Sequence, residues 1–167
     1  MKKIALAFFC AFLVFATSSF AQKFGYINSQ ELLSVMPEVR KADSSLQLFA
    51  KSYQDQLETM SKEYQKKLQE YQAQAKTMSD AVKEVKEKEL MDLQNRIEST
   101  NQSATDKVQK KKEELYSPIL EKADKAIKEV AKANNYDYVF DSGAGALLYA
   151  KDSDNILPLV KTKLGIK

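Results

Sequence analysis

The sequence predicts a mainly α-helical protein with a small β body. In this fold a long antiparallel helical hairpin, a coiled-coil-like arm, projects from a short-stranded β body that serves oligomerisation. Three observations predict it: only four Gly and three Pro occur in 167 residues, neither type lies between Pro37 and Pro118, and short stretches near both ends alternate like strands. The uninterrupted stretch would make about 120 Å of continuous helix, which is too long for a compact domain of this size.

The first 21 residues have the pattern of a secretory signal peptide. Met1–Lys3 is basic, Ile4–Phe20 is apolar, and Ser19-Phe20-Ala21 is a small-x-small cleavage motif. We expect cleavage before Gln22 and export. An uncleaved anchor is the alternative, although the apolar stretch would span only about 26 Å as a helix, against a bilayer core of about 30 Å. The only cysteine, Cys10, lies in this segment, so we expect no disulfide in the mature chain.

Residues 37–118 are predicted to fold back as two antiparallel helices, with a single continuous rod as the alternative. Ser79 or Asp80 can cap a new helix close to the midpoint of this stretch, so we place the tip near 77–80. In the first helix, apolar residues follow one another at steps of three or four: Val39, Ala42, Leu46, Phe49, Tyr53, Leu57, Met60, Tyr64, Leu68, Tyr71, Ala75 and Met78.

The second helix of the arm has a weaker apolar stripe. Its members are Val82, Val85, Leu90, Leu93, Ile97, Ala104, Val108 and Leu115. Polar pairs at Thr100-Asn101 and Lys111-Lys112 interrupt this stripe. We therefore expect looser packing along that part of the arm.

The body is predicted from two separate segments, residues 22–36 and 119–167. Phe24–Asn28 and Tyr136–Asp141 alternate like strands, and Leu147–Ala150 is predicted as a third strand after a hairpin loop at Ser142–Ala146. A helix from Ile119 to about Asn135 is expected before them. A short helix within Asp154–Leu164 is expected after them.

So few strands and aromatic residues are not expected to form a stable body from one chain. We therefore expect a homo-oligomer in which strands from several copies cover one another's edges. Seven residues are predicted to form the contacts between subunits: Phe24, Tyr26, Ile27, Tyr138, Phe140, Leu148 and Tyr149.

The composition argues against an enzyme. The chain has no His and one Cys, which excludes serine–histidine triads, cysteine proteases and the usual zinc hydrolases. A net charge of +3 does not indicate a nucleic-acid-binding protein. Ser142–Ala146 lacks the Lys-Ser/Thr of a phosphate-binding loop, and the carboxylates of residues 137–154 have no EF-hand spacing. We predict no catalytic, cofactor or metal site.

The order of several short segments resembles a known family. The N-terminal part carries Phe24-Gly25-Tyr26-Ile27-Asn28, Glu31-Leu32-Leu33 and Pro37-Glu38 before the helix pair. The C-terminal part carries Ala126-Ile127, Val130-Ala131, the stretch from Asn135 to Asp141, Leu147-Leu148-Tyr149-Ala150 and Asp154-Asn155-Ile156. In this order they resemble the Skp/OmpH family of periplasmic chaperones over essentially the whole mature chain.

The resemblance implies a homotrimer whose β body carries three arms around a cavity. In that cavity, unfolded outer-membrane β-barrel proteins would be held without ATP while they cross the periplasm. It also implies arm-tip contacts with a client or with lipid, including weak contact with a membrane surface, for which the candidates are Lys76, Met78, Lys83, Lys86 and Lys88. A structural or tethering coiled-coil protein of the cell envelope is the alternative function.

Overall fold

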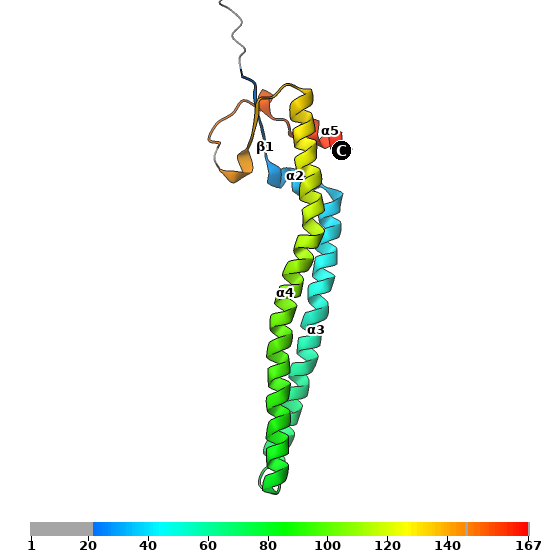
Figure 1. Cartoon of the computed structure of the whole chain (residues 1–167), viewed down its shortest axis with the longest axis vertical. Coiled ribbons are helices and arrows are strands. Elements are labelled where there is room, and N and C mark those ends of the chain that lie inside the picture. The colour runs from blue at the N-terminus through cyan, green and yellow to red at the C-terminus, as the bar shows by residue number, and fades with distance from the viewer. Residues whose placement is uncertain (1–21, 146, 167) are drawn as a thin grey trace, which may run out of the picture. The chain divides into compact units, whose positions relative to one another are not determined.

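The computed structural model describes residues 22–145 and 147–166 (Figure 1). The chain divides into two compact units. One, here called the body, contains residues 22–29 and 126–165, and the other, here called the arm, contains residues 30–125. The predicted signal peptide lies outside the described residues. Among the described residues, none of the helices combines the length and apolar character needed to cross a bilayer.

The arm is a helical hairpin. Its main helices are α3 (Pro37–Gln74) and α4 (Asp80–Ala133), which lie side by side in opposite directions in Figure 1. Residues 75–79 form the turn between them. Pro37 occupies the first turn of α3, where a missing backbone N–H leaves no helical hydrogen bond unmade. A short helix that the sequence did not indicate, α2 (Ser29–Val35), precedes α3.

The apolar stripe of the first helix faces inward, as its spacing predicts. Each of its members from Val39 to Met78 is buried or half-buried, and Ala42 and Met60 are the most deeply buried residues of α3. In the arm part of α4 the buried residues are Leu90, Leu93, Ala104, Ile119 and Ala123. The hairpin is therefore held mainly by a seam of apolar contacts between its two helices.

The predicted stripe of α4 is wrong at its first two positions. Val82 and Val85 are 44% and 57% exposed. The face of α4 is set by Leu90 and Leu93, and steps of four and three back from Leu90 reach positions 86 and 83 rather than the two valines. Val82 and Val85 thus lie outside the seam.

Pro118 does not end the descending helix, contrary to the predicted boundary of the arm. It lies inside α4, which continues to Ala133. A proline within a helix removes one backbone hydrogen bond, and here the residues that follow it, Ile119 and Ala123, are buried. The apolar contacts of that face maintain the helix beyond the proline.

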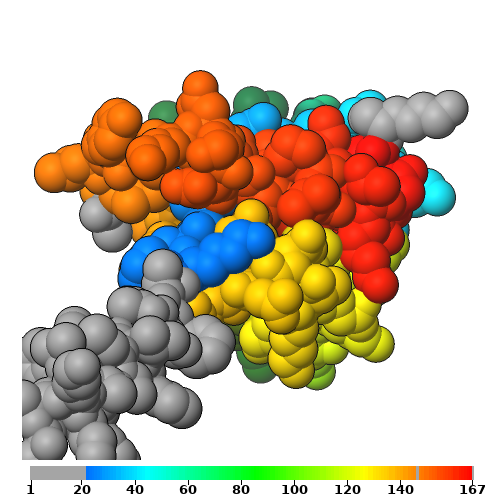
Figure 2. All heavy atoms as spheres, turned by 90° about the horizontal axis from the view of Figure 1, so that it is seen from above, coloured from blue at the N-terminus to red at the C-terminus, as the bar shows by residue number. Residues whose placement is uncertain are grey.

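The body contains a two-stranded parallel sheet. Strand β1 (Phe24–Ile27) pairs with β2 (Tyr138–Asp141), with Phe24 opposite Tyr138 and Tyr26 opposite Phe140. Parallel strands need a long crossover connection, which here contains both long helices. In Figure 2 the blue β1 segment lies beside the yellow end of α4 and the orange and red C-terminal segments. The last helix is α5 (Leu157–Leu164).

The predicted β-hairpin and third strand are not present. Ser142–Ala144 is a 3₁₀ turn, η1, and 147–150 is irregular, while Ala146 lies outside the described residues. The second edge of β1 is occupied instead by residues near Asn155, since Ile156 donates its N–H to the Tyr26 carbonyl at 2.9 Å. A second 3₁₀ turn, η2 (Asp152–Asp154), leads into this contact. The chain after β2 therefore joins the sheet beside β1 at Asn155, and not as a hairpin partner of β2.

Gly25 permits a close approach at the centre of the body. A Cβ added there would lie 3.0 Å from Cδ1 and Cε1 of Tyr136 and 3.1 Å from Cγ2 of Ile156. We expect Gly25→Ala to lower the free energy of unfolding by about 1–3 kcal/mol, the usual cost of overpacking. Thermal unfolding followed by circular dichroism measures this, with Ser153→Ala in the exposed η2 turn as the control. An unchanged melting temperature would show that the ring of Tyr136 moves aside freely.

Candidate functional surfaces

One face of the small sheet is apolar and exposed. The register brings Phe24, Tyr26, Tyr138 and Phe140 to the same face, because side chains alternate along each strand. The Phe24 ring stacks on Tyr138 and Phe140, with ring centroids 5.8 Å and 6.1 Å apart. Yet Phe24, Tyr138 and Phe140 remain 46%, 54% and 47% exposed.

The irregular segment 147–150 extends this surface. Leu148 is 98% exposed and Tyr149 is 81% exposed. Tyr149 lines a hollow of about 240 Å³ together with Phe24 and Phe140. Leu148 does not line this hollow, so of the predicted subunit contacts the surface includes Phe24, Tyr26, Tyr138, Phe140 and Tyr149, and we call these five residues the body patch.

Ile27 does not belong to this surface, although the sequence analysis grouped it there. It is 2% exposed and lies on the opposite face of β1, toward the interior of its own chain. The alternation along β1 carries this information, because Ile27 is one residue away from Tyr26 and three from Phe24. A buried side chain of this kind stabilises the body and is not available to another subunit.

Asp141 at the end of β2 binds Ser29, the last residue of the first body segment. Its carboxylate accepts hydrogen bonds from the Ser29 hydroxyl at 2.5 Å, the Ser29 N–H at 3.1 Å and the Gly143 N–H at 2.9 Å. These bonds, the one from the Ser29 hydroxyl above all, hold the pKa of Asp141 below its usual value. The ionised carboxylate therefore stabilises the folded body.

Removing this charge should change how stability depends on pH. Because the folded-state pKa of Asp141 is lowered, its stabilisation is present above the ordinary aspartate pKa of about 4 and is lost as pH falls through the folded value. Because the carboxylate is exposed and solvent screens its charge, we expect Asp141→Asn at pH 7 to lower the free energy of unfolding by only about 0.5 kcal/mol. The difference from wild type should shrink below about pH 4. Urea unfolding at several pH values measures it; a gap that is constant with pH, or equal to that of Asp152→Asn, would contradict the assignment.

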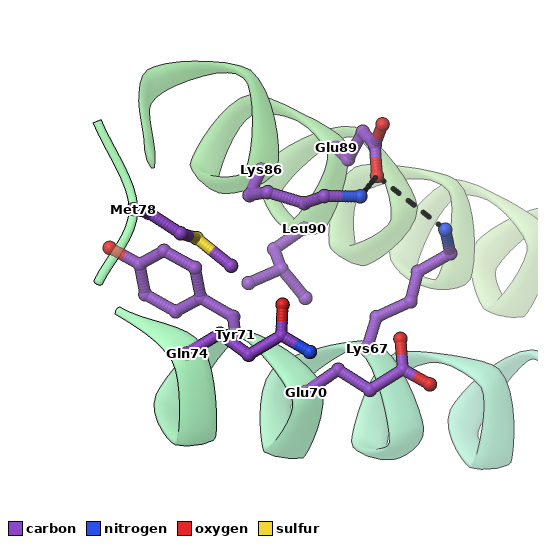
Figure 3. Close-up of a pocket in the computed structure, with 8 residues that line it drawn as sticks. All are labelled: Lys67, Glu70, Tyr71, Gln74, Met78, Lys86, Glu89 and Leu90. Atoms are coloured by element: carbon purple, nitrogen blue, oxygen red, sulfur yellow. Dashed lines mark hydrogen bonds and ion pairs between the residues drawn. The ribbon is translucent and has the colours of Figure 1, made fainter. Parts of the chain in front are cut away.

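The arm tip contains a small hollow of about 90 Å³ (Figure 3). Glu89 forms ion pairs with Lys86 on the same helix at 3.3 Å and with Lys67 on α3 at 3.6 Å, and the second of these pairs joins α3 to α4. Lys86 and then Lys67 lower the pKa of Glu89. Beside these charges, Tyr71 donates a hydrogen bond across the helices to Glu87. The residues that line the hollow are Lys67, Glu70, Tyr71, Gln74, Met78, Lys86, Glu89 and Leu90.

The structure separates the five predicted tip residues. Met78 and Lys86 meet at the hollow, whereas Lys83 is paired with Asp80 at 3.4 Å. Lys76 and Lys88 are exposed and do not line it. Two lysines and two glutamates balance in the lining. The tip hollow therefore offers no net positive charge to an anionic ligand.

Halfway along the arm, α3 and α4 leave a larger hollow of about 450 Å³. We call it the mid-arm groove, and its lining residues are Ala50, Tyr53, Gln54, Leu57, Ala104, Thr105, Val108 and Gln109. A second hollow, of about 270 Å³, is also lined by Tyr53, together with Ser99, Thr100, Ser103 and others. Small side chains of α4 face the tyrosine here, so the helices are not closely packed at this level. The interrupted stripe of α4 indicated the loose packing but not the groove.

Comparison with known proteins places this architecture among relatives. The family model described as outer membrane protein (OmpH-like) matches residues 23–164. The chain is 28% identical over 158 residues to the "Chaperone protein Skp" of Photorhabdus luminescens, covering 93% of this chain and 94% of that protein. It is 27% identical over 154 residues to the protein of the same name from Pectobacterium atrosepticum, with 89% and 93% covered.

A solved structure has a similar fold. The crystal structure of an OmpH-like protein from Caulobacter crescentus superimposes with a TM-score of 0.76, covering 86% of this chain and 84% of that one. The two sequences are only 14% identical, so this likeness concerns the fold alone.

Proposed function

The chain belongs to the OmpH-like family, and we propose that it is an ATP-independent periplasmic holdase that binds unfolded outer-membrane β-barrel proteins and prevents their aggregation in transit. It acts by binding and is not an enzyme. The observation that carries the proposal is the extent of the likeness: the family match runs through both body and arm, and the relatives named as Skp chaperones align over about nine-tenths of the chain.

The same proposal includes export and assembly. Cleavage before Gln22 would release the mature chain into the periplasm, and three copies would join through the body patch. Exposed apolar side chains on so small a body support this, because a subunit interface removes such a surface from water. Ile27 is left out of the proposed contact surface, since it is already buried.

The arm would hold clients through many weak contacts rather than through one site. Apolar residues remain exposed along it, among them Leu48 at 70%, Met91 at 63% and Leu120 at 47%. Lysines near them would attract acidic stretches of a client. A flexible, unfolded client can satisfy such scattered contacts because its chain adapts to them.

The experiment is a light-scattering mass of the mature protein, alone and after addition of a urea-unfolded outer-membrane β-barrel protein diluted into buffer without nucleotide. We expect a mass of three chains, which rises by one soluble client. An oligomer that leaves the client to aggregate would support the envelope tether instead. A requirement for ATP would contradict the holdase mechanism.

A further inference from the structure

The mid-arm groove points to a more specific form of binding than scattered surface contacts. We propose that it is a discrete pocket for an uncharged, apolar side chain of an unfolded polypeptide, with the neighbouring backbone of that polypeptide lying along its rim. The inference rests on the proposed function, since it names the part of a client that one region of the arm selects. Charge, shape and rim chemistry each support it.

The groove is uncharged within a chain that is rich in charge. Lys, Arg, Asp and Glu make up 29% of all residues, yet none of the eight lining residues belongs to these types. The tip hollow, by contrast, is lined by four charged side chains. A charged group entering the mid-arm groove would lose hydration without gaining an opposite charge from its lining, whereas an apolar group gains from burial.

The wall of the groove is held in place before any ligand arrives. The Tyr53 ring makes an edge-to-face contact with Phe49, with centroids 5.3 Å apart, and the Lys107 ammonium lies 5.6 Å from the Tyr53 ring centre. Tyr53 is half-buried and therefore presents part of its surface to the groove. A wall fixed in this way loses little conformational freedom when a side chain binds against it.

The rim carries groups that suit a polypeptide backbone. Gln54, Thr105 and Gln109 place amides and a hydroxyl around the apolar floor. The Thr105 hydroxyl donates a hydrogen bond to the Asn101 carbonyl at 3.1 Å, and the Gln109 side-chain amide donates one to the Glu113 carboxylate at 2.9 Å. Among the described residues, the Gln54 amide has no such partner. It can donate to and accept from the unpaired C=O and N–H groups of an unfolded chain.

The size of the groove favours an unfolded chain over a folded partner. The hollow of about 450 Å³ is open to solvent along its length, so a side chain of an extended polypeptide can enter it from the side. That space accepts one or two side chains. A stable contact with a folded protein needs about 800 Å² on each side, which requires a far larger surface.

The test fills the groove from α3. Ala50 lines the groove and is half-buried, and Ala50→Leu adds an apolar group inside it. Ser52→Leu adds apolar bulk at an exposed position about 200° away around the helix and serves as the matched control. Affinity for a urea-unfolded outer-membrane β-barrel protein is measured by fluorescence titration. We expect Ala50→Leu to weaken binding about tenfold, the value of one buried apolar side chain, while Ser52→Leu binds like wild type.

Equal affinity of wild type, Ala50→Leu and Ser52→Leu would overturn the pocket and leave the holdase function intact. Failure of the wild type itself to bind would instead overturn the proposed function. If Ala50→Leu loses its helical circular dichroism, a second experiment places the photo-crosslinking residue benzoylphenylalanine at position 54 or at position 52 and measures crosslinking to the client. We expect a covalent adduct with the client at position 54 and little at position 52; equal yields, or adducts only between copies of this chain, would overturn the inference.

Discussion

Replacing Phe140 with aspartate is expected to convert the proposed trimer into single chains. Phe140 is 47% exposed on the apolar face of the sheet, and its ring centroid lies 6.1 Å from that of Phe24. If subunits meet there, the new carboxylate would be buried at the interface without a partner. An uncompensated buried charge of this kind costs about 3–5 kcal/mol for each subunit. Light scattering should then give the mass of one chain.

Leu159→Asp is the matched control for this experiment. Leu159 is 43% exposed, close to the value for Phe140, but it lies on α5 outside the body patch. This variant should keep the mass of the wild type. Dissociation by both variants would indicate general destabilisation of the body, and an unchanged mass for Phe140→Asp would remove the body patch from the interface.

Ile156→Ala is expected to cause the largest loss of stability within the body. Ile156 is fully buried, its Cγ2 lies against the Gly25 backbone, and its N–H bonds to the Tyr26 carbonyl at 2.9 Å. Truncating a fully buried aliphatic residue costs about 2–5 kcal/mol, from lost apolar burial and the cavity left behind. So small a core has few other contacts to replace these.

Urea unfolding of the body measures this loss, followed by the tyrosine fluorescence of the chain, which has no Trp. Leu159→Ala on the exposed side of α5 is the control, and we expect its effect to stay within about 0.5–1 kcal/mol. A loss below about 1 kcal/mol for Ile156→Ala would mean that the neighbouring side chains collapse into the vacated space.

The arm could be predicted from the sequence because its information is local. Apolar residues at steps of three and four, with no Gly or Pro between Pro37 and Pro118, specify an amphipathic α3 without reference to any other part of the chain. The helix end predicted at Pro118 was wrong, because burial of Ile119 and Ala123 on the same helix outweighs the local signal of the proline for helix termination.

The body and the grooves could not be predicted in the same way, because they depend on pairing between distant residues. Alternation in 24–27 and 138–141 reveals strands but neither their partners nor their relative direction, so it did not show that β2 pairs in parallel with β1 rather than in a hairpin with 147–150. The mid-arm groove depends on which small residues of α4 face Tyr53, a register that neither helix encodes alone. For Ile27, by contrast, alternation along β1 already placed it opposite the exposed aromatic face.

The parallel pairing of β1 with β2 has a consequence for the order in which the chain folds. Phe24 must wait for Tyr138, a partner 114 residues later, whereas the contacts between α3 and α4 nearest the turn join residues close in sequence, such as Tyr71 and Glu87. Contacts of low sequence separation form faster than distant ones. The hairpin should therefore form first, beginning at its turn. The β1–β2 sheet can form only after nearly the whole chain is present. Until then β1 carries unpaired backbone and exposed aromatic rings, so the nascent chain is itself prone to aggregation over this interval.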